Sequence, residues 1–126
     1  MRKEFRISLP NKPGQLARVA ENLGLQGVNI LAVAAIGAAN PVIALVVDLE
    51  DKTRKVLKKL RLRFQEVELL TVDVPHRPAQ LAAFAKKMGD AKINIESIYL
   101  LEKSKGKVKV ALTVSDLNKA KQKLDL

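Results

Sequence analysis

Alternating apolar and polar residues open the chain. Phe5, Ile7 and Leu9 alternate with polar residues, which is the two-residue period of a half-buried strand. Pro10 ends this run. The apolar positions of the next segment have helical spacing: Leu16, Val19, Ala20 and Leu23. The pattern therefore predicts a strand, then a loop in which Asn11 can cap the following helix, and then an amphipathic helix with that stripe facing a core.

The next segments complete the predicted order of strands and helices. Two apolar runs, Val28 to Ile36 and Val42 to Leu49, flank a turn at Gly37 to Pro41 and predict a hairpin. Helical spacing returns from Asp51 to Leu62, and a further strand begins at about Phe64. The predicted order β-α-β-β-α-β is the split β-α-β, or ferredoxin-like, arrangement, with helices on one face of an antiparallel sheet.

The chain then repeats itself at an offset of 65 residues. Pro10-Asn11-Lys12-Pro13-Gly14-Gln15-Leu16 returns as Pro75-His76-Arg77-Pro78-Ala79-Gln80-Leu81. Such self-similarity indicates a duplicated structural unit. The second copy predicts a helix from Leu81 to Met88, a hairpin from Ile93 to Val114 and a last helix from Asp116 to Leu124. It has no closing strand, so its sheet has an open edge that another subunit or the first copy's edge could cover.

The duplication predicts an α+β protein of two ferredoxin-like units, at residues 1–67 and 68–126. No linker separates them, because the region of about 64–74 has to close the first unit and open the second. Each unit is small enough to be marginally stable alone, and we therefore expect a dimer or a larger assembly.

The motifs on this topology resemble the ACT domain, a small regulatory module that binds amino acids in metabolic enzymes. They are the Pro-Asn-Lys-Pro-Gly-Gln-Leu loop and Gly27-Val28-Asn29-Ile30, with a second set at His76 to Ala79 and Ile93 to Ile95. The chain as a whole is similar to stand-alone tandem ACT proteins. The resemblance implies a ligand site where the loop of one module meets the start of the second strand of another. Carried onto this sequence, that site comprises Asn11, Lys12, Pro13, Gly14, Gln15, Leu16, Asn29, Ile30, Asn94 and Ile95.

The two loops differ at one position that matters. Glycine at a helix start allows a ligand to approach free backbone N–H groups, where the helix dipole favours a carboxylate. Gly14 has this role in the first copy, whereas Ala79 replaces it in the second, so we expect the first loop to bind and the second to be mainly structural. Structural explanations remain for other residues: Asn29 and Asn94 can bond a turn, and Leu16 and Leu81 fit a core better than a pocket wall.

Composition excludes several kinds of chemistry. The 126 residues contain no cysteine and one histidine, His76, for which the sequence offers no catalytic partner set. We expect no enzyme activity, no catalytic residue, no metal site and no cofactor. The first residues are too charged for a signal peptide and no apolar run has membrane length, which predicts a cytoplasmic protein.

The net charge of +10 allows two interpretations. One is a solvated, lysine-rich surface; the other is an anionic partner such as nucleic acid. RNA recognition motifs share the topology but stack bases on aromatic side chains of the sheet, and here the corresponding strands offer only Phe5. The leading expectation is a non-enzymatic regulatory homodimer that binds a free amino acid between ACT modules. The alternatives are a basic binding module for nucleic acid or an acidic protein, and a purely structural role.

Overall fold

The computed structural model describes residues 2–37 and 39–126, so Ala38 in the predicted turn lies outside the described residues. Contacts divide the chain into two compact units, Met1–Glu68 (unit 1) and Leu69–Leu126 (unit 2). Each unit has its own sheet and its own apolar core.

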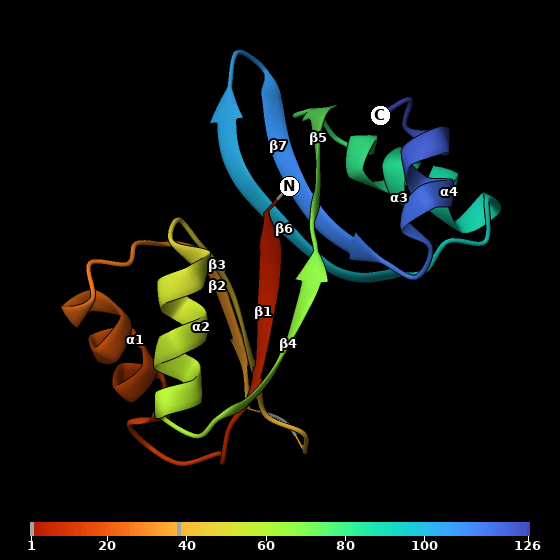
Figure 1. Ribbon diagram of the computed structural model, residues 1–126. Helices are drawn as coiled ribbons and strands as arrows, with labels where there is room; N and C mark the ends of the chain where they lie inside the picture. Colours follow the sequence, from red (N-terminus) through yellow and green to blue (C-terminus); the bar gives the residue numbers. More distant parts are fainter. Residues whose placement is uncertain (1, 38) are drawn as a thin grey trace. The chain divides into compact units, whose positions relative to one another are not determined.

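Unit 1 has the predicted order of elements (Figure 1). They are β1 (Lys3–Ser8), α1 (Gln15–Leu25), β2 (Ile30–Ile36), β3 (Val42–Val47), α2 (Glu50–Lys59) and β4 (Arg63–Glu68). The strands form one antiparallel sheet in the order β2-β3-β1-β4, and both helices cover the same face of it. Because β1 and β2 are each antiparallel to β3, they run in the same direction, so the loop after β1 and the turn after β2 lie at one end of the sheet.

The core of unit 1 follows from the period of its strands and helices. Phe5 and Ile7 of β1 are fully buried on the helix-covered face, and Val19 and Leu23 of α1 pack against them. From α2, Leu57 joins the same cluster. These positions are the apolar members of a two-residue and a 3.6-residue period, so burial of one face per element explains why these segments adopt their structure.

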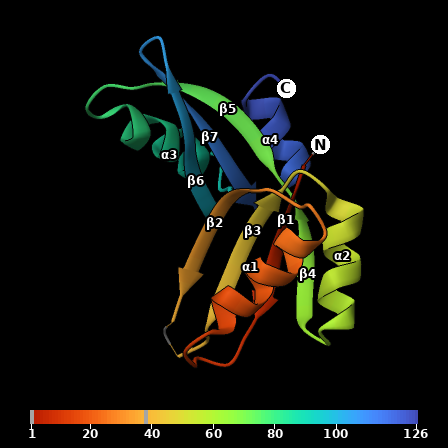
Figure 2. The ribbon, with the colours of Figure 1, turned by 90° about the vertical axis from the view of Figure 1, so that its left-hand side faces the viewer.

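Unit 2 repeats this arrangement with one strand fewer (Figure 2). It contains β5 (Leu70–Pro75), α3 (Gln80–Asp90), β6 (Ile95–Ser104), β7 (Lys107–Val114) and α4 (Leu117–Lys123). Its antiparallel sheet has the order β5-β7-β6, in which β5 takes the place that β1 has in unit 1. The predicted fold class is confirmed: two ferredoxin-like units, of which the second lacks the last strand.

A separate core holds unit 2 together. Leu70 and Val74 of β5 and Val110 of β7 are buried against Phe84 and Met88 of α3. The α4 helix adds Ala120, and Asp116 caps that helix by accepting a hydrogen bond from the Lys119 backbone N–H at 3.1 Å. Asp116 is the kind of residue that satisfies a helix start, which explains where α4 begins.

The segment between the units divides into two strands with different partners. Residues of β4 pair with β1, for example Val67 with Glu4. Residues of β5 pair with β7, for example Val72 with Val110. Only Leu69, which is 2% exposed, lies between them. Each half of the segment predicted to serve both units therefore completes one sheet.

Candidate functional site

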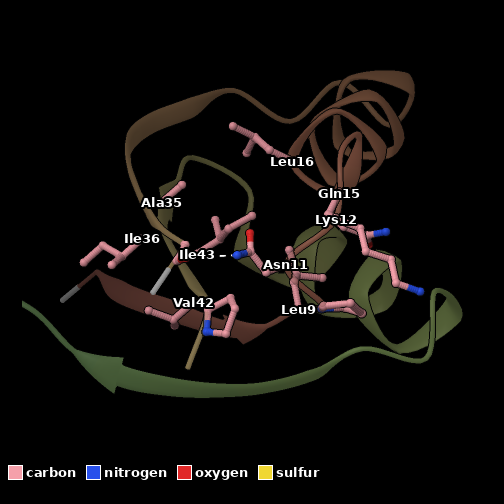
Figure 3. A pocket seen from close by; sticks show the side chains of 12 residues that line it. Leu9, Asn11, Lys12, Gln15, Leu16, Ala35, Ile36, Val42 and Ile43 are labelled. Atoms are coloured by element: carbon pink, nitrogen blue, oxygen red, sulfur yellow. Dashed lines mark hydrogen bonds between the residues drawn. The ribbon is translucent and has the colours of Figure 1, made fainter. Parts of the chain in front are cut away.

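A small cavity lies at the end of unit 1 where the loop after β1 faces the turn after β2. It has a volume of about 150 Å³. We call it the loop pocket. One side is formed by Leu9, Pro10, Asn11, Lys12, Gln15 and Leu16. The other side is formed by Ala35, Ile36, Gly37, Pro41, Val42 and Ile43. Figure 3 shows side chains from both sides around this space.

Asn11 joins the two sides of the loop pocket. Its side-chain amide donates a hydrogen bond to the Gly37 carbonyl at 3.0 Å, shown as a dashed line in Figure 3. The approach is close: a Cβ at Gly37 would lie 3.1 Å from Asn11 Oδ1, so a larger residue at position 37 would require the Asn11 side chain to shift. The prediction that Asn11 caps α1 is wrong, because the N-cap of α1 is Gly14, three residues later, and the Asn11 amide has the turn as its partner.

The start of α1 is open and electropositive. Its N-cap residue is Gly14, with φ 85° in the left-handed region, and no side chain of the described residues caps the helix. The first turn contains no acidic residue, so the partial positive charge of the helix N-terminus is not offset there. Lys12 precedes the helix and is exposed. A negatively charged group is the complement of this surface.

Unit 2 has the same backbone geometry at the corresponding helix start. Ala79 is the N-cap of α3 and has φ 70°, so an alanine adopts the conformation that Gly14 adopts in unit 1. Left-handed backbone costs a non-glycine residue roughly 1–2 kcal/mol. A Cβ built on Gly14 would meet no atom of the described residues within 4 Å. The difference between the loops is therefore backbone strain and not a clash within the protein.

Gln15 is an unusual member of the loop pocket. Its Oε1 atom is a buried side-chain polar atom for which the described residues provide no hydrogen-bond partner. An unsatisfied buried acceptor costs about 1–3 kcal/mol, so such an atom calls for an explanation. A hydrogen-bond donor that enters the pocket is one explanation that fits the lining.

Two leucines differ from the sequence-based prediction. Leu16 and Leu81 are 42% and 46% exposed, so the prediction that they are core residues is wrong. Each occupies the first turn of its helix, at the end of the apolar stripe, where the sheet no longer covers it. Leu16 lines the loop pocket instead.

The predicted site residues are only partly brought together. Asn11, Lys12, Gln15 and Leu16 line the loop pocket, and Pro13 and Gly14 are exposed in the same loop. Asn29 and Ile30 lie at the opposite end of β2, roughly 20 Å along a strand of this length. There the Asn29 N–H donates to Asp48 Oδ1 at 2.8 Å, and Ile30 packs on the core.

Asn94 and Ile95 have the corresponding places in unit 2. The Asn94 N–H donates to Ser115 Oγ at 3.0 Å, and Ile95 packs against the core of that unit. Within either unit, therefore, the start of the second strand and the helix-start loop are at opposite ends of the sheet. A site that uses both kinds of residue needs a second module.

Sequence reasoning missed the far side of the loop pocket. Ile36 and Val42 are a cross-strand pair at the end of the hairpin, and Ile36 is 59% exposed. The signal was available in the topology, because two strands that run in the same direction end at the same side of a sheet. Residues at the end of the second strand could have been assigned to the site on that basis.

The side chains whose pKa values are shifted lie in a different part of unit 1. Arg54 of α2 donates through Nε to Glu66 of β4 at 2.8 Å and through its guanidinium to Asp51 at 2.6 Å. These hydrogen bonds raise the pKa of Arg54 and lower the pKa of Glu66 below its ordinary value of 4.5. Arg54 also lies over the Phe5 ring at 5.9 Å. The group fixes α2 to β4 and is structural.

The one aromatic side chain that the sequence offered for base stacking is not available for it. Phe5 is fully buried on the helix-covered face of the sheet, where no nucleotide can reach it. His76 takes part in a turn, because its backbone N–H donates to the Gly106 carbonyl at 2.8 Å, and its side chain is exposed. Among the described helices none combines the length and the apolarity that crossing a membrane requires.

Comparison with known proteins identifies the fold. No family model and no curated protein sequence matches the chain. The solved structure of protein BT0572 from Bacteroides thetaiotaomicron matches with 25% identity and a TM-score of 0.83, over 98% of this chain and 85% of that one. The regulatory subunit of aspartate kinase from Thermus flavus matches with 15% identity and a TM-score of 0.69, over 98% and 90%.

A further regulatory subunit of aspartate kinase, from Thermus thermophilus, matches with 17% identity and a TM-score of 0.65, over 98% of this chain and 87% of that one. The likeness extends over both units of the chain. The resemblance to a tandem ACT protein is thus confirmed at the level of the fold.

Proposed function

We propose that this chain is a non-enzymatic, cytoplasmic regulatory protein that binds a free amino acid in the loop pocket of unit 1. The observation that carries the proposal is the chemistry of that pocket. Lys12 and an uncapped helix start lie on one side, Gln15, whose buried Oε1 has no partner among the described residues, is one of the lining residues, and most of the other lining residues are apolar. The regulatory role is supported by the two Thermus proteins of the same fold, which are regulatory subunits.

The carboxylate of the ligand binds at the start of α1 in this proposal. Backbone N–H groups of a first helical turn have no partner within the helix, and Gly14 supplies no side chain that would satisfy them or block access. Lys12, two residues before Gly14 in the same loop, adds a positive charge to this region. These groups favour an anion without any rearrangement of the loop.

The ammonium group has a matching acceptor. Gln15 Oε1 is buried and unsatisfied among the described residues, and rotation of the Gln15 side chain can bring it to a ligand in the pocket that Gln15 lines. A bound ammonium group then removes the cost of the unpaired oxygen and gains a charge-assisted hydrogen bond. The ligand thus supplies the hydrogen-bond donor that Gln15 Oε1 lacks among the described residues.

A second module completes the site in this proposal. The edge strand β2 beside the loop pocket exposes Leu31, Val33 and Ile36, which are 48%, 48% and 59% exposed. A facing module in a homodimer would cover this apolar edge and bring Asn29 and Ile30, or Asn94 and Ile95, to the pocket. Binding regulates assembly if the ligand prefers the paired arrangement over the separate one.

A calorimetric screen of the twenty amino acids tests the binding. We expect at least one to bind with a Kd in the micromolar to millimolar range, and no response at millimolar concentration from any of them would end the proposal. In Lys12→Gln the affinity should fall about tenfold, because a charge contact to the carboxylate is lost.

The repeat supplies a matched control for that variant. Arg77 occupies the position of Lys12 in the second loop, and Arg77→Gln removes the same charge from the protein without touching the loop pocket. Equal losses of affinity in both variants would show a general effect of net charge. Light scattering with and without the bound amino acid then measures whether assembly responds.

A further inference from the structure

We propose that the amino acid held by the loop pocket has a small, uncharged, branched aliphatic side chain, as in valine, leucine and isoleucine. This inference rests on the proposed function and adds the class of ligand. It follows from the charge, the lining and the size of the pocket.

The charge of the lining excludes a charged side chain. Among the described residues, Lys12 is the one charged side chain that lines the pocket, and no aspartate or glutamate accompanies it. A ligand ammonium or guanidinium side chain would lie near Lys12 and a helix N-terminus without a counter-ion. A second carboxylate on the ligand would have to share Lys12, because the lining contains no second cationic side chain among the described residues.

The wall opposite the loop favours hydrocarbon. Ile36, Val42 and Ile43 come from the hairpin and Leu16 comes from α1, and Figure 3 shows all four around the pocket. Leu16 is 42% and Ile36 is 59% exposed, so apolar surface is available for a ligand to cover. Each methylene group buried against such a wall strengthens binding about fourfold.

The two amide side chains of the described lining have other roles in this arrangement. The Asn11 amide already donates to Gly37, and Gln15 is needed for the ligand's ammonium group. Threonine has the shape of valine but would place its hydroxyl against the apolar wall. An apolar pocket discriminates against such an isostere by about 100-fold at most, so we expect valine to bind about 10- to 100-fold more tightly than threonine.

The size of the loop pocket favours a small side chain. A cavity of about 150 Å³ holds one benzene-sized molecule. Part of this volume has to take the α-carbon and its ammonium group, so three or four side-chain carbons fit. A phenyl or indole group together with the ligand backbone would extend beyond this volume, so less of it would contact the apolar lining.

Calorimetry with a fixed panel tests the inference. We expect valine, leucine or isoleucine to bind at least tenfold more tightly than alanine, threonine, lysine, aspartate or phenylalanine. Tighter binding of lysine, aspartate or phenylalanine than of all three aliphatic amino acids would overturn the inference while the proposed function stands. If no amino acid binds, the proposed function and the inference fail together.

A variant with a new charge in the wall sharpens the test. Ile36→Asp places a carboxylate in the apolar side of the pocket at an exposed position. The ratio of lysine affinity to valine affinity should rise at least tenfold, because the added carboxylate pairs with the side-chain ammonium of lysine, whereas for valine it only removes an apolar contact. Repulsion of the α-carboxylate is common to both ligands and cancels in the ratio.

Leu25→Asp is the matched control. Leu25 ends α1, is 81% exposed and does not line the pocket, so this variant adds the same charge elsewhere. It should leave the lysine-to-valine ratio unchanged. A ratio that stays constant in Ile36→Asp, with circular dichroism showing a folded protein, contradicts the assignment of Ile36 to the side-chain end of the site.

Discussion

Units 1 and 2 share an order of elements and the left-handed backbone at the start of their first helix. They differ in the number of strands in the sheet and in the residue that precedes that helix. In unit 1, β4 completes the sheet beside β1 and an uncapped glycine precedes α1. In unit 2, β5 pairs with β7 alone among the described strands, and an alanine precedes α3. The shared features therefore belong to the common fold, and the differences distinguish one unit from the other.

The backbone of the two loops is the clearest part of this comparison. Gly14 has φ 85° and Ala79 has φ 70°, although only glycine adopts such values without strain. The path of the chain from the first strand to the first helix is therefore imposed by the fold. The residue at that position decides how much strain the unit carries and how closely another molecule can approach.

The largest predicted effect concerns the strand that unit 2 lacks. Phe64 of β4 packs against the core of unit 1, with its ring centroid 6.0 Å from that of Phe5. Phe64→Ala should destabilise the protein by about 2–4 kcal/mol, because it removes a large apolar side chain from a packed site. Urea denaturation gives the free energy, and hydrogen exchange shows which unit opens.

Leu124→Ala provides the comparison in unit 2, where Leu124 is also partly buried but no fourth strand of the described residues covers the sheet edge. We expect a smaller loss there. If both substitutions cost the same, β4 does not give unit 1 a better-packed edge.

The second prediction concerns pH. Arg54 holds the pKa of Glu66 below its ordinary value of 4.5, so the ionised Glu66 stabilises the folded state at neutral pH. Glu66→Gln should cost about 1–2 kcal/mol at pH 7, an amount reduced by partial exposure of the pair.

A depressed folded-state pKa means that this stabilisation is fully present above pH 4.5 and is lost as the pH falls through the folded value. The difference in unfolding free energy between wild type and Glu66→Gln should therefore shrink in acid. A difference that is constant from pH 7 to pH 3 would show that the charge of Glu66 contributes nothing. Arg54→Met should reduce the same pH dependence and leave the smaller part that comes from the Lys3–Glu66 ion pair.

The third prediction exchanges the residues at the two helix starts. Ala79→Gly should stabilise the protein by about 1 kcal/mol, because relief of left-handed strain exceeds the added freedom of the unfolded chain. Gly14→Ala should destabilise it by a similar amount without a steric clash, since a Cβ there meets no described atom within 4 Å. Thermal unfolding of both variants checks the signs, and two changes of the same sign would contradict the common backbone geometry.

The smallest predicted effect distinguishes the two glutamines that follow these residues. Gln15→Met removes an unsatisfied buried oxygen and should raise stability by about 0.5–1 kcal/mol while weakening amino acid binding. Gln80→Met, at the repeated position in unit 2, should leave binding unchanged. A Gln15→Met protein that is less stable than wild type would show that the oxygen has a partner in solution.

Much of the fold could be predicted from the sequence because its signals are local. The alternation of Phe5, Ile7 and Leu9, the helical spacing that ends at Leu23 and the repeat itself each depend on neighbouring residues. The boundary between β4 and β5 could not be predicted in this way. Residues from Arg63 to Pro75 continue one extended pattern, and the change of partner strand at Leu69 is set by pairing with distant segments.

The candidate site was predictable in part for the same reason. The loop motif is contiguous in the sequence, and it alone identifies Asn11, Lys12, Gln15 and Leu16. Which other residues face that loop depends on the direction of β2 in the sheet, so the hairpin side of the pocket was missed. The partner of Asn11 was missed as well. An asparagine side chain can cap a helix or bond a distant turn, and the sequence alone does not show which of the two it does.

The alanine at the start of α3 has a consequence for how the two halves of the chain can diverge. Codons for alanine and glycine differ by a single base, so relief of the strain at Ala79 is one mutational step away. That step would place a glycine at the uncapped start of α3, two residues after Arg77, in a loop whose backbone already has the left-handed conformation. The second loop thus has the same backbone conformation at its helix start as the first loop, so this substitution would require no rearrangement of its backbone.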